Sequence, residues 1–107
     1  MTTTVDKSSD YAGEFSSIAI DASGKAHISY RDGDNGVLRY ATNASGAWVT
    51  TTVDSSEDVG AYASIAIGTS GSAHISYYNA TNGDIKYATN ASGAWTTTIV
   101  DDGVGSL

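Results

Sequence analysis

SIAIDASGKAHISYRDGDNGVLRYATNASGAW, residues 17–48, recurs 47 residues later as SIAIGTSGSAHISYYNATNGDIKYATNASGAW, residues 64–95. The two stretches are identical at 22 of 32 aligned positions. A shorter motif, Thr-Thr-Thr-Val-Asp, occupies residues 2–6 and 50–54, and a related Thr-Thr-Ile-Val-Asp occupies residues 97–101. The chain of 107 residues is therefore built from two tandem copies of one repeat, and the fold of that repeat decides the fold of the chain.

The hydrophobic pattern of each repeat is that of β-strands. Ile18 and Ile20 alternate with small or polar residues, as do Ile28 and Tyr30, and a period of two is typical of a pleated strand. Clusters of Asp, Asn, Ser and Gly separate these stretches and favour tight turns. We therefore expect four antiparallel strands per repeat, at residues 15–20, 26–31, 37–42 and 48–53 and at residues 62–67, 73–78, 84–89 and 95–100.

The repeat also predicts the organisation of the chain and its core. We expect an N-terminal strand or arm with its link over residues 1–14, a first four-stranded unit over 15–54, a second over 55–101 and a C-terminal tail over 102–107. The large apolar residues of the strands should be buried in both repeats. They are Ile18, Ile20, Ile28, Tyr30, Tyr40 and Trp48, and Ile65, Ile67, Ile75, Tyr77, Tyr87 and Trp95.

Four short strands per repeat are also the signature of a β-propeller blade. The repeat resembles those of bacterial tandem-repeat β-propellers, whose units have the form SIAID-SG-HISYYD-TNGDLKYATN-SGW. It is loosely similar to the Asp-box hairpin of sialidase-like propellers, with Asn43 five residues before Trp48. Ala41 replaces the usual Ser and the glycine is displaced to Gly46, so this second resemblance implies the hairpin shape and nothing catalytic. The first implies that the chain is two propeller blades.

Two blades do not close a ring. A blade is apolar on both faces, so two blades alone expose two apolar faces, which soluble monomers rarely tolerate. We expect head-to-tail association with copies of the same chain into a closed homo-oligomer with an even number of blades, a trimer or a tetramer being favoured. The fourth-strand motif occurs three times, but the two repeats need only two fourth strands. Its C-terminal copy should hold the outer edge, leaving the N-terminal copy as a loose arm or as a competitor for a neighbour's edge.

Composition excludes several classes of partner. Twelve acidic and five basic residues give a net charge of −7, which opposes binding to nucleic acids and to anionic membranes. The chain has no cysteine, so it has neither disulfides nor thiolate metal sites. No signal peptide or membrane-spanning stretch is recognisable in the chain as given. The compartment stays undetermined, and the composition also suits a secreted or cell-surface parent protein.

Two features could bind metals. His27 and His74 occupy equivalent positions and could converge on a ring axis, although packed, hydrogen-bonded histidines are the preferred interpretation. The loop at residues 32–36 has the oxygen density that Ca²⁺ prefers, but it lacks the spacing of an EF-hand, so a solvated hairpin is preferred. We therefore expect no cofactor. The weak calcium candidates are Asp32, Asp34, Asn35 and Asp84.

Trp48 and Trp95 could stack on sugars, but their fixed place at the start of a strand favours a packing role. Catalysis is not expected: the chain has two arginines, Arg31 and Arg39, and no Ser-His-Asp set outside the repeated framework. The preferred hypothesis is a self-assembling structural or interaction module, an isolated or engineered piece of a longer repeat protein. The alternative is a lectin that binds carbohydrate between blades, with weak candidates at the two tryptophans and the two histidines.

Overall fold

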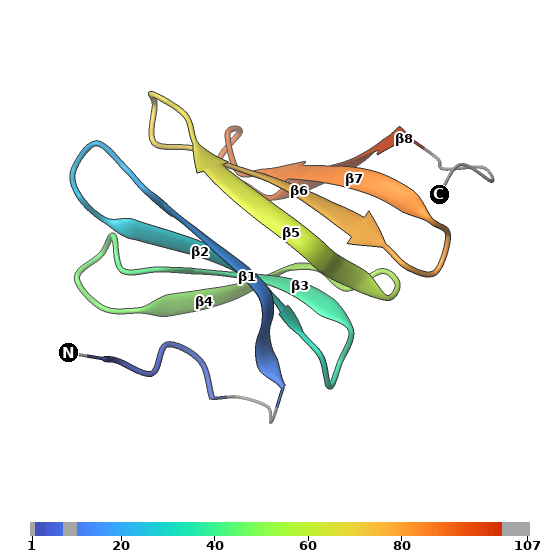
Figure 1. The fold of residues 1–107 in the computed structure, drawn as a ribbon. Helices are drawn as coiled ribbons and strands as arrows, with labels where there is room; N and C mark the ends of the chain where they lie inside the picture. The colour runs from blue at the N-terminus through green and yellow to red at the C-terminus, as the bar shows by residue number, and fades with distance from the viewer. Residues whose placement is uncertain (1, 8–10, 102–107) are drawn as a thin grey trace.

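The computed structural model describes residues 2–7 and 11–101, and in this part of the chain it contains strands and no helix. The strands form two antiparallel four-stranded sheets, each in sequence order (Figure 1). The expected all-β fold with four strands per repeat is confirmed. The first sheet contains β1 (Ala12–Ile20), β2 (Ala26–Asp32), β3 (Val37–Thr42) and β4 (Val49–Asp54), and the second contains β5 (Val59–Ile67), β6 (Ala73–Asn79), β7 (Asp84–Thr89) and β8 (Thr96–Asp101).

The strand boundaries agree with the sequence prediction to within one residue, except at the start of the first strand of each sheet. β3 and β7 have the predicted bounds, whereas β1 and β5 begin three residues earlier than expected. The difference arises at Phe15 and Tyr62, whose φ values of 53° and 56° interrupt the alternation on which the prediction rested. The pairing register shifts around both residues, so each first strand contains a bulge and continues beyond it. The two units thus span residues 12–54 and 59–101.

The hairpin turns are held by side chains of the repeat. The backbone N–H of Gly46 donates to the carbonyl of Asn43 at 2.9 Å, and the Asn43 side chain accepts from the N–H of Ala26 at 2.9 Å. Asn90 accepts from Ala73 in the same way at 2.8 Å. The asparagine five residues before each tryptophan therefore connects the third hairpin turn to the start of the second strand.

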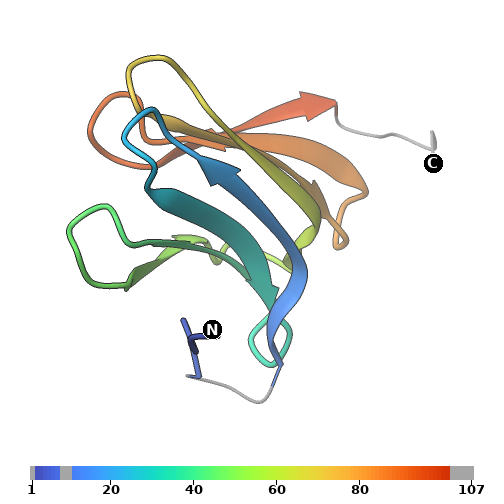
Figure 2. The ribbon, with the colours of Figure 1, turned by 60° about the vertical axis from the view of Figure 1, so that its left-hand side comes forward.

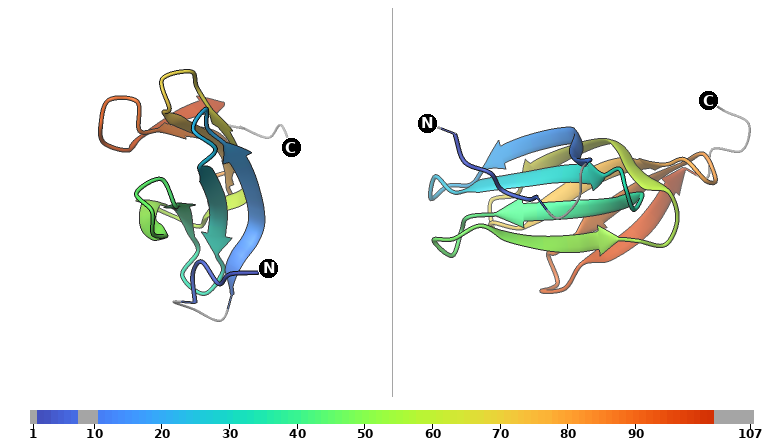
Figure 3. Two further views of the ribbon diagram at one scale, coloured as in Figure 1. Left: turned by 90° about the vertical axis from the view of Figure 1, so that its left-hand side faces the viewer. Right: turned by 90° about the horizontal axis from the view of Figure 1, so that it is seen from below.

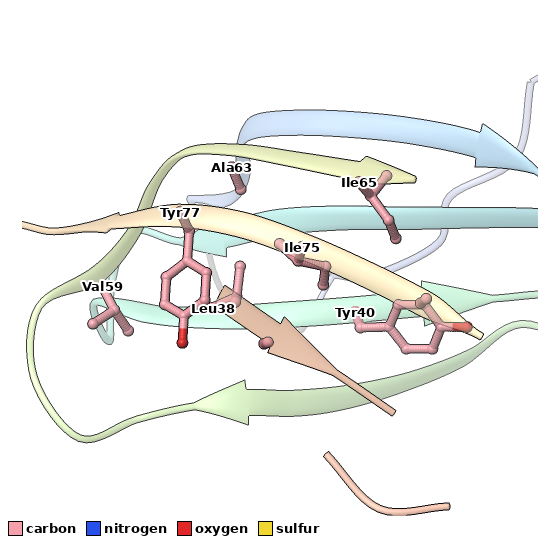
Figure 4. Close-up of a cluster of buried hydrophobic side chains, with 9 residues drawn as sticks. Leu38, Tyr40, Val59, Ala63, Ile65, Ile75 and Tyr77 are labelled. Atoms are coloured by element: carbon pink, nitrogen blue, oxygen red, sulfur yellow. The ribbon is translucent and has the colours of Figure 1, made fainter. Parts of the chain in front are cut away.

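The two sheets stack face to face, with β5 lying over β1, β2 and β3 (Figure 2). Leu38 and Tyr40 of the first sheet meet Ile65, Ile75 and Tyr77 of the second in a shared core (Figure 4). We call the two contacting surfaces the packed faces and the two opposite surfaces the outer faces. The outer face of the first sheet carries Ile18, Ile28, Tyr30 and Arg39, and that of the second carries Ser76, Tyr78, Ile85 and Tyr87.

Ten of the twelve predicted core residues are buried or partly buried, and the other two are exposed. Five of the twelve residues are buried, namely Tyr30, Tyr40, Ile65, Ile75 and Tyr77, and five are partly buried, namely Ile28, Trp48, Ile67, Tyr87 and Trp95. Ile18 and Ile20 are each 59% exposed, so their predicted burial is wrong for the single chain. The reason is that no second sheet covers the outer face on which Ile18 lies.

Residues 2–7 lie against the outer face of the first sheet, beside β2 and β3 (Figure 3, right). They form no strand, but the Asp6 carboxylate is anchored there by Tyr30 and Arg39. In the single chain these residues are therefore held on the first sheet, and their place in an assembly, as a loose arm or on a neighbour's edge, stays a prediction. The expected C-terminal tail, residues 102–107, lies outside the described residues, as do residues 8–10 of the link.

Candidate functional site

One carboxylate joins the two sheets. Asp54, the last residue of β4, accepts hydrogen bonds from the Tyr77 hydroxyl and from Nζ of Lys86, both at 2.7 Å. Burial raises the pKa of Asp54, but the hydrogen bonds from Lys86, Ser56 and Tyr77 outweigh it and lower that pKa to about 2. Burial, followed by the hydrogen bond to Asp54, raises the pKa of Tyr77. We call Asp54, Tyr77 and Lys86 the Asp54 clasp.

The same arrangement occurs on the outer face of the first sheet. Asp6 accepts from the Tyr30 hydroxyl at 2.6 Å and from Nε of Arg39 at 3.1 Å. Burial and the hydrogen bond to Asp6 raise the pKa of Tyr30 to about 12. Tyr30 and Arg39 are the repeat counterparts of the tyrosine and lysine in the Asp54 clasp. Residues 2–6 therefore lie on the first sheet as the end of β4 lies on the second, and we call Asp6, Tyr30 and Arg39 the Asp6 clasp.

The outer faces repeat the chemistry of the packed faces, but large apolar residues on them are exposed. Leu38, on the packed face of the first sheet, is 0% exposed, whereas its counterpart on the second sheet, Ile85, is 39% exposed. Ile65, on the packed face of the second sheet, is 8% exposed, whereas its counterpart Ile18 is 59% exposed. Each outer face thus carries the residue types that the other sheet presents on its packed face.

An open cavity of about 220 Å³ lies between the N-terminal segment and the first sheet. Val5 and Asp6 line one side, and Gly13, Ser16 and Ile28 line the other. The cavity is mostly apolar and opens on the outer face of the first sheet.

The two candidate histidines have structural roles. His27 is 4% exposed, with Nδ1 lying 2.6 Å from the Tyr40 hydroxyl and Nε2 lying 2.8 Å from a carboxylate oxygen of Asp21. The hydrogen bond with His27 is the main cause of a lowered pKa of Asp21. His74 contacts the Tyr87 hydroxyl at 2.7 Å. Within residues 2–7 and 11–101, no three His, Asp or Glu side chains are grouped as a metal site would require.

The four weak calcium candidates are not all brought together, because three share one turn and Asp84 lies in the other sheet. Asp32 is 1% exposed and accepts hydrogen bonds from the backbone N–H of Asp34 at 3.1 Å and from the Asn35 side chain at 2.9 Å. These bonds shape the β2–β3 turn. Asp84 begins β7 in the other sheet, where it pairs with Asn79. The four residues therefore belong to two different hairpins.

The tryptophans differ in their surroundings. Trp95 is partly buried and packs edge-on against Tyr40, with ring centroids 5.0 Å apart. This contact lies between the sheets and supports the packing role of Trp95. Trp48 holds the corresponding position in the first repeat and is also partly buried.

Sequence reasoning missed both clasps. The signal that could have found them was the recurrence of Asp at the end of the fourth-strand motif. A tyrosine and a basic residue also occupy equivalent positions in the two repeats. The alternation of apolar residues does not reveal this contact, because Asp6 and Asp54 reach across to a different sheet or segment.

No protein-family model matches the chain, and no curated protein matches it either. Among the residues that the structure describes, no helix is long and apolar enough to cross a membrane.

Proposed function

We propose that the chain is a two-blade piece of a β-propeller that associates head to tail with copies of itself into a closed ring, and that it acts as a structural or interaction module without catalysis. The observation that carries the proposal is the exposure of repeat-equivalent residues. Ile18 and Ile85 are exposed on opposite outer faces, while their counterparts Ile65 and Leu38 are buried against each other's sheets in the core.

The two outer faces suit each other because each copies one side of an interface that already exists in the chain. The outer face of the second sheet copies the packed face of the first, and the outer face of the first copies the packed face of the second. Contact between them would remove apolar surface from water, which favours association. A contact between two different faces is heterologous and closes into a ring when the rotation per copy allows it.

The test of this proposal is the mass of the assembly in solution. Ile18→Lys places a charge on the outer face of the first sheet and should give folded monomers, because an unpaired charge is costly to bury at an interface. Ala44→Lys, in the exposed β3–β4 turn, is the matched control and should assemble as the unmodified chain does. Light scattering with circular dichroism reports mass and fold. A folded, monomeric unmodified chain, or an unchanged mass for Ile18→Lys, would contradict the proposal.

Carbohydrate binding is the second candidate, and one group of exposed aromatic residues favours it. Tyr62 is 71% exposed and lies next to Phe15 and Tyr78, with ring centroids 4.8 and 6.1 Å away. Exposed aromatic rings can stack on the apolar faces of sugars. Glycan-array binding that is lost in Tyr62→Ala, with the mass of the assembly unchanged, would support a lectin, and no saturable binding would exclude it.

A further inference from the structure

The side chain of Leu38 fills a defined place between the two sheets. It is fully buried in a cluster with Val59 and Tyr77 (Figure 4). Its backbone also approaches β5 closely, because a Cβ added to Gly60 would lie 3.2 Å from the Leu38 Cα. Because Gly60 has no side chain, β3 of the first sheet packs directly against β5 at this position.

The equivalent place on the outer face of the first sheet is open. A Cβ added to Gly13, the counterpart of Gly60, would have nothing within 4 Å. The cavity of about 220 Å³ lies there, lined by Gly13, Ser16, Ile28 and Tyr30. The counterparts of these four residues, 47 positions later, are Gly60, Ala63, Ile75 and Tyr77, and three of them belong to the cluster around Leu38.

The residue that corresponds to Leu38 is Ile85, which is similar in size and 39% exposed. It lies on the outer face of the second sheet, so within one chain it faces away from the first sheet and its cavity. Its neighbours also match those of Leu38, since Tyr87 corresponds to Tyr40. A residue with the shape that fits the cavity is thus present, but on the opposite side of the molecule.

We infer that Ile85 of a second copy of this chain fills the cavity on the first sheet, and that Trp48 then packs on Tyr87 of that copy as Trp95 packs on Tyr40. The inference rests on the proposed function, because the contact forms only if copies associate head to tail. It adds the residue-level register of the contact, which the exposure of the outer faces alone does not define.

The experiment tests whether volume added by one substitution compensates for volume removed by another. Ser16→Leu adds to the cavity wall about the volume that Ile85→Ala removes, and Ser16 is exposed in the single chain, so its fold should survive. Each single substitution should raise the concentration of half-assembly about tenfold, a factor that corresponds to about 1.4 kcal/mol. The double substitution should assemble more tightly than Ser16→Leu alone, because neighbours couple and distant sites do not.

Ile99→Ala is the matched control for Ile85→Ala. Ile99 is 53% exposed on β8 and pairs with Lys86, on the other face of that sheet. It should neither weaken assembly by itself nor compensate for Ser16→Leu. Ile28→Ala provides a second variant, since it enlarges the cavity and should weaken assembly without unfolding the chain. Analytical ultracentrifugation measures the half-assembly concentrations, and circular dichroism confirms the fold.

The failure of this inference is distinguishable from the failure of the proposed function. If the unmodified chain assembles and the effects of Ser16→Leu and Ile85→Ala multiply without compensation, the contact between them is wrong while the ring stands. If the unmodified chain is a folded monomer at every concentration, the proposed function itself is wrong and the inference falls with it.

Discussion

At the scale of single residues, the two clasps decide how the chain's parts are placed. Asp54 is 6% exposed and Lys86 is 8% exposed, so their ion pair is shielded from solvent. The desolvation of such a pair offsets much of its attraction, but removing one partner leaves an uncompensated buried charge. We therefore expect the pair to act mainly on specificity, because only a sheet that presents a carboxylate at the end of its fourth strand satisfies Tyr77 and Lys86.

The Asp54 clasp predicts a loss of stability in acid. The pKa of Asp54 is about 2 in the folded chain and near 3.8 without the clasp. The Asp54 carboxylate therefore contributes stability that is present above about pH 4. That contribution, about 2 kcal/mol, is lost as the pH falls through the folded value. Urea unfolding of the monomeric Ile18→Lys chain at pH 5 and pH 2 measures it. Asp54→Asn should be less stable at pH 5 and show a smaller drop.

The control for this prediction is Asp58→Asn, in the link between β4 and β5 that follows Asp54. Asp58 is exposed and bonds Arg31. Exposed ion pairs contribute little, so this variant should keep the full drop in stability between pH 5 and pH 2. A drop that is equal in Asp54→Asn and in Asp58→Asn would show that the Asp54 clasp is not its source.

At the scale of the elements, two segments compete for one place on the first sheet in the proposed assembly. They are residues 2–6 of the same chain and the end of β8 of a second copy. β8 pairs with β7 over its whole length, from Thr89 opposite Thr96 to Ile85 opposite Asp101. Asp101 corresponds to Asp54 of the first repeat, and so does Asp6. If a second copy docks in the geometry of the internal contact, the end of its β8 therefore arrives where residues 2–6 lie. One of the two segments must then move away from this position.

Deletion of residues 1–6 tests which segment is dispensable. We expect the shortened chain to assemble, because β8 keeps its hairpin with β7 and its Asp101 can take the place of Asp6 beside Tyr30 and Arg39. Removal of residues 96–107 is the matched deletion and should abolish assembly. The two masses are compared by light scattering. Assembly that is lost in the first deletion and kept in the second would mean that residues 2–6 replace β8 in a neighbouring copy.

At the scale of the whole molecule, the two-sheet unit limits the number of sheets that a closed ring can contain. Each copy contributes two sheets, so a closed assembly of whole copies has an even number of sheets. If copies associate through their outer faces, the angle between the two sheets of one chain should repeat at every contact, because the outer faces copy the packed faces. A ring built in this way has a single closed size rather than a range of sizes.

Native mass spectrometry should therefore give one sharp species, for which we expect three or four copies. The species should persist on dilution further than a pair held by a single contact would, because the release of one copy from a closed ring requires two contacts to break. A ladder of masses that grows with concentration would indicate open chains instead. Ile85→Lys should convert the sharp species into monomers, since it removes one of the two complementary faces.

The sequence by itself determined the strands and their order. Alternating apolar residues and Asp, Asn and Gly turns depend on local chain geometry, and both β3 (37–42) and β7 (84–89) fall where these signals predict. Only the tertiary structure decided which of two equivalent residues is buried. Ile18 and Ile65 share the local sequence Ser-Ile-Ala-Ile, yet one is 59% and the other 8% exposed, because burial depends on the neighbouring sheet. The Asp6 clasp likewise joins residues that are distant in the chain, and strand periodicity carries no information about such contacts.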